Sequence, residues 1–253
     1  MAPRPNRPPD DAIVAGRRPV LELLRSGRPV KALLVARDLR DSEVVRELKE
    51  SAARAGVATT TTTRAEIDRI AKGLNHQGVV AEVGRYRYAP LEDLLKDARH
   101  LLFVDGVTDP HNLGSLLRSA DGSGFSGVVI PAHRASGVTA TVRRVSAGAA
   151  EIVPVARVTN LGRALDQARG SGFWVVGLDE KAGETIWETD ALEPPVALVL
   201  GSEGKGISRG VLGRCDSTVR IPSQGRLASL NVAVAGAIAM FEATRRGETS
   251  DTL

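Results

Sequence analysis

The sequence has 253 residues, enough for one large or two modest domains with a sizeable core. Basic side chains exceed acidic ones by four, a mild excess that is compatible with a nucleic-acid partner and is weak evidence by itself. The single cysteine, Cys215, excludes an internal disulfide framework and multi-cysteine metal sites, and no stretch reaches the roughly 18 apolar residues of a membrane span. We therefore expect a cytoplasmic protein without a metal site or a membrane partner.

Residues 1–11 are rich in proline and arginine and lack the apolar core of a signal peptide, so we expect a disordered basic tail there. Helical and strand patterns then alternate over residues 12–84, which predicts a small α/β domain. We expect its strands at Val30–Val35, Val57–Thr62 and Val79–Val83, and its helices around Val20–Leu24, over Asp41–Ala55 and over Arg64–Ala71.

The segment Arg85–Pro90 changes composition abruptly and ends in a proline, so we expect it to begin a linker over residues 85–98. Its two tyrosines alternate with arginines, which leaves stacking on RNA bases as an alternative.

Strand and helix patterns alternate again over residues 99–247, before a short tail at 248–253. This alternation predicts a mostly parallel sheet with helices on both faces. We expect its strands at Leu101–Val104, Gly127–Ile130, Phe173–Val176, Val196–Leu200 and Thr218–Ile221.

Three segments in this half each run from a strand, through a loop bearing glycine, asparagine or serine, into a helical pattern. They are residues 101–120, 196–208 and 218–239. Ligands of α/β sheets bind at the carboxyl ends of strands, so the three segments together predict one composite site.

The middle segment contains GSEGKGIS, which is not a phosphate-binding loop because a glycine, not serine or threonine, follows Lys205. It also lacks the dinucleotide-binding fingerprint. Its glycines at 201, 204 and 206 let the backbone approach a ligand closely, with Glu203 as the only acidic group. A tight turn capped by glycines is the alternative.

In the first segment, Asn112 lies where a helix should begin, either as its N-cap or as a ligand contact. Arg118 follows six residues later and is expected to point back toward the strand end, where it suits an anion such as phosphate. In the third segment, we expect Ser229 to cap the apolar helix Val232–Phe241, which leaves Asn231 unexplained by capping.

The strings DGVTDPHNLGSLLRSA, LVLGSEGKGIS and IPSQGRLASLNVAVA resemble the three signature motifs of the SpoU (TrmH) branch of the SPOUT RNA 2′-O-ribose methyltransferases, in order and in spacing. GRRPV at 16–20 and HQGVVA at 76–81 resemble the ends of the substrate-binding domain of 23S rRNA methyltransferases of the RlmB type. The resemblance implies a SPOUT-type α/β fold with a C-terminal trefoil knot, a small N-terminal α/β substrate-binding domain, S-adenosyl-L-methionine as methyl donor, and a homodimer with active sites across the subunit interface.

The resemblance also implies roles for individual residues. The donor would be held, largely through backbone, at Gly201, Ile221, Leu230, Gly206 and Leu200. Catalytic positions match Asn112, Arg118, Glu203, Ser229 and Asn231. Arg118 matches the proton acceptor proposed for similar enzymes, yet a guanidinium group is always protonated in proteins and is a poor base. We expect it instead to orient the hydroxyl and a phosphate and to stabilise developing negative charge.

RNA contacts are expected on both sides of the site, from Arg17, Arg18, His76, Gln77, His111, Arg143 and Arg144. For the arginines at 143 and 144 a solvated helix face is an equal alternative. His100 and His133 are expected at the surface.

These features together predict a ribose 2′-O-methyltransferase acting on 23S rRNA. A tRNA ribose methyltransferase and a drug-resistance rRNA methyltransferase are rivals within the class, and a non-catalytic RNA-binding ribosome assembly factor is a rival from another class. The sequence departs from the family motifs at Ser223, where a methionine is usual, and at Ala233, where a serine is usual.

Overall fold

The computed structural model describes residues 12–225 and 229–250, with the side chains of 248–250 excepted. Contacts divide the chain into two compact units: Met1–Arg87 with Val138–Ile152 (unit 1), and Tyr88–Gly137 with Val153–Leu253 (unit 2). The predicted basic tail at 1–11 lies outside the described residues, as do 251–253. The sequence placed 138–152 within a 99–247 domain, whereas the contacts group it with the N-terminal part.

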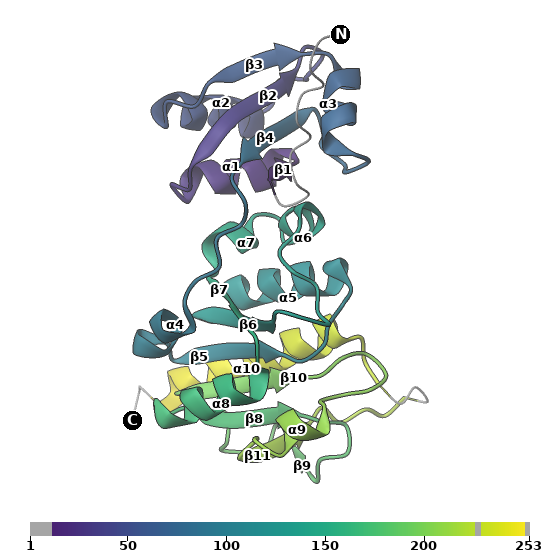
Figure 1. Ribbon diagram of the computed structural model, residues 1–253. Helices are drawn as coiled ribbons and strands as arrows, with labels where there is room; N and C mark the ends of the chain where they lie inside the picture. Colours follow the sequence, from purple (N-terminus) through teal and green to yellow (C-terminus); the bar gives the residue numbers. More distant parts are fainter. Residues whose placement is uncertain (1–11, 226–228, 251–253) are drawn as a thin grey trace. The chain divides into compact units, whose positions relative to one another are not determined.

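Unit 1 is built on a four-stranded sheet in the order β1-β4-β2-β3, in which β4 runs antiparallel to β1 and β2, while β2 and β3 are parallel (Figure 1). Its strands are β1 (Ile13–Ala15), β2 (Val30–Ala36), β3 (Thr59–Thr62) and β4 (Val79–Val83). Its helices are α1 (Arg17–Arg25), α2 (Glu43–Arg54), α3 (Arg64–Ala71), α6 (Ala140–Val145) and α7 (Ala149–Ile152). The predicted strands and helices of this region are present, and β1 is an addition to them.

Apolar side chains cover both faces of this sheet. Helices α1 and α2 bury Leu23 and Leu48 against one face. Ile67 of α3 and Ala140 of α6 belong to a second cluster that includes Ile13 of β1. Because α6 supplies part of this core, the 138–152 segment is a structural part of unit 1.

A buried cluster of charged side chains also connects residues 138–152 to the rest of unit 1. Glu151, 1% exposed at its side chain, forms ion pairs with Arg143 at 2.9 Å and Arg28 at 3.3 Å. The Tyr86 hydroxyl donates to the carbonyl of Ala150 at 3.1 Å, and both guanidinium groups lie over the Tyr86 ring. Burial raises the pKa of Glu151 and that of Tyr86.

Unit 2 is built on a seven-stranded sheet in which all neighbouring strands are parallel, in the order β7-β6-β5-β10-β8-β11-β9. Its strands are β5 (His100–Val104), β6 (Gly127–Pro131), β7 (Val155–Val158), β8 (Trp174–Leu178), β9 (Glu184–Thr185), β10 (Val196–Leu200) and β11 (Ser217–Arg220). Its helices are α4 (Leu91–Asp97), α5 (Pro110–Gly122), α8 (Leu161–Gly170), α9 (Arg209–Leu212) and α10 (Val232–Ser250).

Helices cover both faces of the unit 2 sheet, as the sequence predicts. Leu94 of α4, Leu165 of α8 and Val211 of α9 share one core cluster with alternate residues of the central strands. On the other face α10 packs against α5 and β10, where a Cβ at Gly236 would lie 2.5 Å from Leu116 and 2.6 Å from Leu200. Glycine at this position therefore lets α10 approach the sheet closely.

Several details differ from the predicted elements. The expected linker 85–98 contains α4, and the expected tail beginning at 248 continues α10 to Ser250. The short strands β7 and β9 were not predicted. None of the helices in the described part of the chain is both long and apolar enough to cross a bilayer.

Candidate functional site

The first two predicted loops meet because β5 and β10 are hydrogen-bonded neighbours, with Leu200 opposite Val104. Past the strand ends, the Asp105 amide donates to the Leu200 carbonyl at 2.7 Å, and the Asp105 carboxylate accepts from the Ser208 amide at 2.8 Å. Asp105 thus joins the two loops. Asp105 directly follows the β5 run, and no sequence pattern singles it out.

Helix α5 begins at Pro110, and Asp109 is its N-cap, accepting from the His111 amide at 2.8 Å. Of the two alternatives for Asn112, the N-cap role is therefore excluded. Pro110 fits the first helical position because its missing N–H has no partner to lose there. Asn112 is the third residue of the helix and is buried, so its side-chain amide is available for another contact.

That contact joins all three segments. Oε1 of Glu203 accepts hydrogen bonds from Nδ2 of Asn112 at 3.0 Å and from Nδ2 of Asn231 at 2.7 Å. Nδ2 of Asn231 also donates to Oδ1 of Asn112 at 3.0 Å. We call these three residues the amide–carboxylate cluster. It places one residue from each motif at a single point, which confirms the composite geometry predicted from the strand ends.

Asn231 has a second role. Its Oδ1 accepts from the amides of Ala233 at 3.0 Å and Val234 at 3.3 Å, so Asn231 is the N-cap of α10. Ser229, expected as the cap, lies exposed two residues earlier. The same side chain therefore fixes the start of the helix with its oxygen and holds Glu203 with its nitrogen.

The loop after β10 folds back on itself through paired backbone hydrogen bonds between Ser202 and Gly206, of 3.1 and 2.9 Å. A Cβ added to Gly201 would lie 2.0 Å from the carbonyl carbon of Gly206, so no larger residue fits this loop as it stands. Gly204 and Gly206 have positive φ values of 75° and 64°. The loop is thus a glycine-dependent backbone surface, with the Lys205 side chain exposed.

The other predicted donor positions lie at the same edge of the sheet. Leu200 ends β10 and is buried, and Ile221 directly follows β11. β8 separates these two strands, which puts their ends roughly 10 Å apart. Leu230, just before α10, leaves 43% of its surface exposed. The described residues here offer backbone groups and apolar side chains, which fit a donor that carries no phosphate.

Arg118 does not join the amide–carboxylate cluster. Six helical residues separate it from Asn112, a rise of about 9 Å and a rotation of about 240°. Its side chain is exposed, and no hydrogen bond or ion pair connects it to any residue that the structure describes. The expectation that Arg118 turns back to its own strand-end cleft therefore receives no support from its contacts.

Arg118 lies one turn before Gly122 on α5, and a Cβ added to Gly122 would lie 3.6 Å from the Phe241 ring of α10. Phe241 is 52% exposed and Val234, two turns earlier on the same side of α10, is 49% exposed. These two half-exposed apolar side chains lie on one helix face, which we call the α10 apolar stripe.

The predicted RNA-contacting residues separate into three groups. Arg17, Arg18, Gln77 and Arg144 line one cavity of unit 1. His76 and Arg143 are buried instead: His76 bonds to Asp68 at 2.8 Å and accepts from the Gly78 amide, and Arg143 pairs with Glu151. Expecting these two to face RNA was therefore wrong. His111 is exposed in unit 2, beside Asp109.

His100 is buried, contrary to expectation, and its ring lies 5.2 Å from that of Phe125. Burial, with a contribution from Arg99, lowers the pKa of His100. Burial also raises the pKa of the Cys215 thiol to about 11. Within 12–225 and 229–250, no three His, Cys, Asp or Glu side chains gather as metal ligands would.

Two family models match the chain. The SpoU rRNA Methylase family matches residues 99–241, and the model for RNA 2′-O ribose methyltransferase substrate binding matches residues 13–89. The chain is 42% identical over 239 residues to a protein of Bacillus subtilis named "Putative TrmH family tRNA/rRNA methyltransferase YacO", covering 92% of this chain and 95% of that one. It is 43% identical over 247 residues to an uncharacterized tRNA/rRNA methyltransferase of Mycolicibacterium gilvum, covering 95% and 78%.

Solved structures agree with these matches. The SpoU methyltransferase AviRb from Streptomyces viridochromogenes superposes with a TM-score of 0.79 at 27% identity, covering 95% of this chain and 91% of that one. An AdoMet-bound rRNA methyltransferase from Sinorhizobium meliloti superposes with a TM-score of 0.78 at 27% identity, covering 92% and 87%.

Proposed function

We propose that this chain, which belongs to the SpoU/TrmH family of S-adenosylmethionine-dependent RNA methyltransferases, methylates a ribose 2′-hydroxyl of 23S rRNA. The observation that carries the proposal is the amide–carboxylate cluster, because it brings one residue of each family motif together. The match of residues 13–89 to a ribose methyltransferase substrate-binding domain supports the ribose as the target. The rRNA methyltransferase from Sinorhizobium meliloti matches 92% of this chain with a TM-score of 0.78, whereas a TrmH/SpoU tRNA modifying enzyme from A. aeolicus matches 64% with a TM-score of 0.55, and this difference supports rRNA over tRNA.

The methyl donor fits the edge of the sheet formed by the loops after β10 and β11. When bound, S-adenosylmethionine supplies a methyl group on a cationic sulfur, an electrophile that needs only an oxygen nucleophile in line with it. We assign its binding to the backbone of Gly201, Gly206 and Ile221, with apolar contacts from Leu200 and Leu230. The closed loop at Gly201 supplies preformed backbone groups, so little ordering is needed on binding.

The amide–carboxylate cluster positions the loops around this edge. Glu203 is held through one carboxylate oxygen by two amides, which fixes the loop that carries Gly201 relative to the starts of α5 and α10. We propose that Asn112, Glu203 and Asn231 set the geometry of the ribose and that exposed Ser229 contacts it. The proton of the 2′-hydroxyl leaves through an RNA phosphate or water.

Arg118 acts, in this proposal, in the active site of a second copy of the chain. It lies beside the α10 apolar stripe and away from its own amide–carboxylate cluster, so a dimer that covers the stripe would carry Arg118 to the partner. There its guanidinium orients the ribose hydroxyl and an adjacent phosphate and stabilises the developing alkoxide.

Mixed dimers test this arrangement. Arg118→Ala and Asn231→Ala chains are each expected to be inactive as homodimers. After unfolding and refolding an equal mixture, half of the dimers are mixed and each mixed dimer has one intact site, so activity returns to about a quarter of the wild-type value. If the mixture stays inactive while the dimers do form, Arg118 and Asn231 serve the same chain's site and the shared-site proposal is wrong.

The reaction itself is tested by transfer of labelled methyl groups from S-adenosylmethionine to unmodified 23S rRNA and tRNA transcripts, with Arg118→Ala in parallel. We expect label in 23S rRNA with the wild type and a loss of at least about a hundredfold with the variant. Label in tRNA alone would favour a tRNA ribose methyltransferase. Donor and RNA binding without transfer to either RNA would favour the non-catalytic assembly factor.

We also propose the trefoil knot and a cytoplasmic location. In the sheet, β10 lies between β5 and β8. Helix α10 follows β11 in the chain and packs on α5, an arrangement that is compatible with a knotted C-terminal segment. A cytoplasmic location follows from the proposed rRNA substrate.

A further inference from the structure

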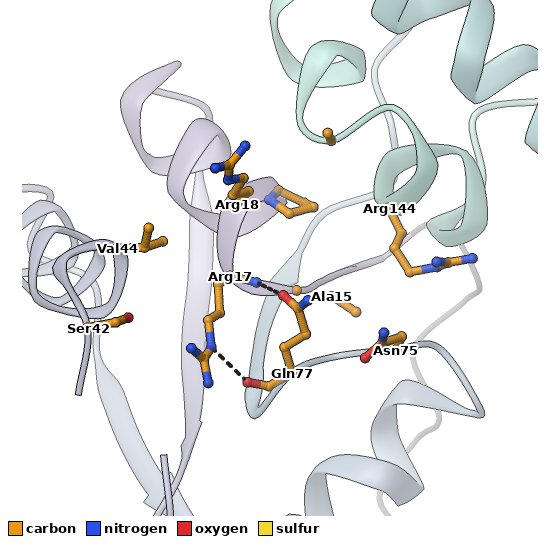
Figure 2. Close-up of a pocket in the computed structure, with 11 residues that line it drawn as sticks. Ala15, Arg17, Arg18, Ser42, Val44, Asn75, Gln77 and Arg144 are labelled. Atoms are coloured by element: carbon orange, nitrogen blue, oxygen red, sulfur yellow. Dashed lines mark hydrogen bonds between the residues drawn. The ribbon is translucent and has the colours of Figure 1, made fainter. Parts of the chain in front are cut away.

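Unit 1 contains a cavity of about 320 Å³ beside the first turn of α1, shown in Figure 2. All of its lining residues belong to unit 1, and its size is at the low end of small-ligand pockets. Space of this size suits one nucleotide and not a duplex. The polar side chains that line it are those of Arg17, Arg18, Ser42, Asn75, Gln77 and Arg144.

The charge of this wall has one sign. Three arginines line the cavity, and among the residues that the structure describes no aspartate, glutamate or histidine does. Nε of Arg144 is buried and has no hydrogen-bond partner among the described residues, and neither Arg18 nor Arg144 forms an ion pair within 12–225 and 229–250. Since buried N–H groups of folded proteins almost always have a partner, the Arg144 Nε–H indicates an acceptor that the described residues do not supply.

Arg17 is already held in place. Its Nε donates to the backbone carbonyl of Gln77 at 3.2 Å, and its backbone amide donates to Oε1 of Gln77 at 3.4 Å, as the dashed lines of Figure 2 mark. These bonds leave the terminal nitrogens of Arg17 and the side-chain nitrogen of Gln77 as donors. A guanidinium fixed in this way loses little freedom when it binds an anion.

The backbone of the cavity wall is also unusual. Gln77 and Ala147, both lining residues, have positive φ values of 51° and 54°, in the left-handed region that non-glycine residues seldom adopt. Such conformations persist where surrounding structure enforces them, and they concentrate at ligand sites.

We propose that this cavity is a nucleotide subsite that binds one phosphate of single-stranded RNA together with its attached nucleotide. The inference rests on the proposed function and adds to it a contact outside the reaction centre. The arginine forks match phosphate oxygens. Asn75, Gln77 and Ser42 supply donors and acceptors for the ribose or a base edge. Among the described residues no aromatic ring lines the wall, so a guanidinium plane is the group that would stack on the base.

The test uses the full chain, unmodified 23S rRNA transcript as the probe, and Arg18→Gln and Arg144→Gln as variants. Lys31→Gln and Lys49→Gln are the controls, because each removes an exposed positive charge of unit 1 that does not line the cavity. Dissociation constants are measured over a series of KCl concentrations, and donor binding, thermal unfolding and kcat at saturating RNA are measured in parallel.

We expect Arg144→Gln to weaken RNA binding about tenfold and to reduce the slope of log K against log salt by about 0.7, the value of one single-strand phosphate contact. Arg18→Gln is expected to act in the same direction. Donor binding should stay unchanged, and the lysine controls should leave kcat unchanged and the RNA affinity within about twofold. Arg144→Lys should keep the salt slope while losing part of the affinity, since it retains the charge without the fork.

If RNA is bound and methylated but Arg144→Gln matches the lysine controls in affinity and slope, the subsite is wrong and the proposed function stands. If inorganic phosphate displaces RNA from the wild type no better than from Arg144→Gln, the proposed phosphate contact is also wrong. A wild-type protein that neither binds nor methylates RNA overturns both proposals.

Discussion

Replacing Glu203 by alanine removes the acceptor shared by the two amides of the amide–carboxylate cluster. Nδ2 of Asn231 keeps the oxygen of Asn112 at 3.0 Å, whereas Nδ2 of Asn112, a buried residue, loses the partner that the structure gives it. Leaving one buried donor without a partner costs about 1–3 kcal/mol. Because Glu203 is exposed, water replaces part of the lost acceptor, and we expect about 1–2 kcal/mol.

If this energy holds the reactive geometry, the rate of methyl transfer under single-turnover conditions falls by roughly 5- to 30-fold in Glu203→Ala. Glu203→Gln keeps an acceptor oxygen at the same position and should retain most of the rate. Lys205→Ala, an exposed change in the same loop outside the cluster, should leave rate and stability unchanged.

Urea unfolding and single-turnover transfer, measured on the same preparations, separate positioning from chemistry. The positioning account predicts that the alanine variant loses both stability and rate, while the glutamine variant loses little of either. A glutamine variant as slow as the alanine variant, at wild-type stability, would show that the carboxylate charge itself is needed and would refute the account.

Three further changes have defined outcomes. Gly201→Ala places a Cβ 2.0 Å from Gly206 and should open the loop, weakening donor binding about tenfold or more by calorimetry, whereas unchanged affinity would exclude the loop from the donor site. Glu151→Ala leaves Arg143 as a buried charge without that partner and should cost about 3–5 kcal/mol of unfolding free energy, with less loss for Glu151→Gln; equal losses would refute the ion pair's role. The folded-state pKa of His100 is lowered, so its stabilising contribution is present above its unfolded pKa of about 6.5 and is lost as the pH falls. His100→Gln should therefore reduce the loss of stability between about pH 7.5 and 5.5, and an unchanged loss would contradict this.

The strand-end site could be predicted because its signal is local. A strand followed by a glycine- or asparagine-bearing loop and a helix carries its own periodicity, and parallel strands bring such loops to one edge. The sequence could not show which neighbour each polar side chain would choose. Asp109 caps α5, for which Asn112 was one of two interpretations, and Asn231 caps α10, for which Ser229 was expected. A cap depends on where the first turn closes, to within one or two residues.

Adjacent residues of unit 1 show the same limit. Arg143 and Arg144 are neighbours with the same chemistry, yet one is buried on Glu151 and Tyr86 while the other lines the cavity. Which arginine turns inward depends on how α6 packs against β1, a strand more than a hundred residues earlier in the chain. A local sequence pattern does not predict a contact between residues so far apart in the chain.

The central claim is that the amide–carboxylate cluster serves methyl transfer to a ribose oxygen. The most direct measurement is nuclease digestion and mass spectrometry of 23S rRNA incubated with the protein and methyl-deuterated S-adenosylmethionine. We predict a single deuterated methyl group on a 2′-oxygen, recognisable by an alkali-resistant dinucleotide, and its absence with Asn231→Ala. A labelled base, or a labelled ribose with undiminished yield from Asn231→Ala, would contradict the account.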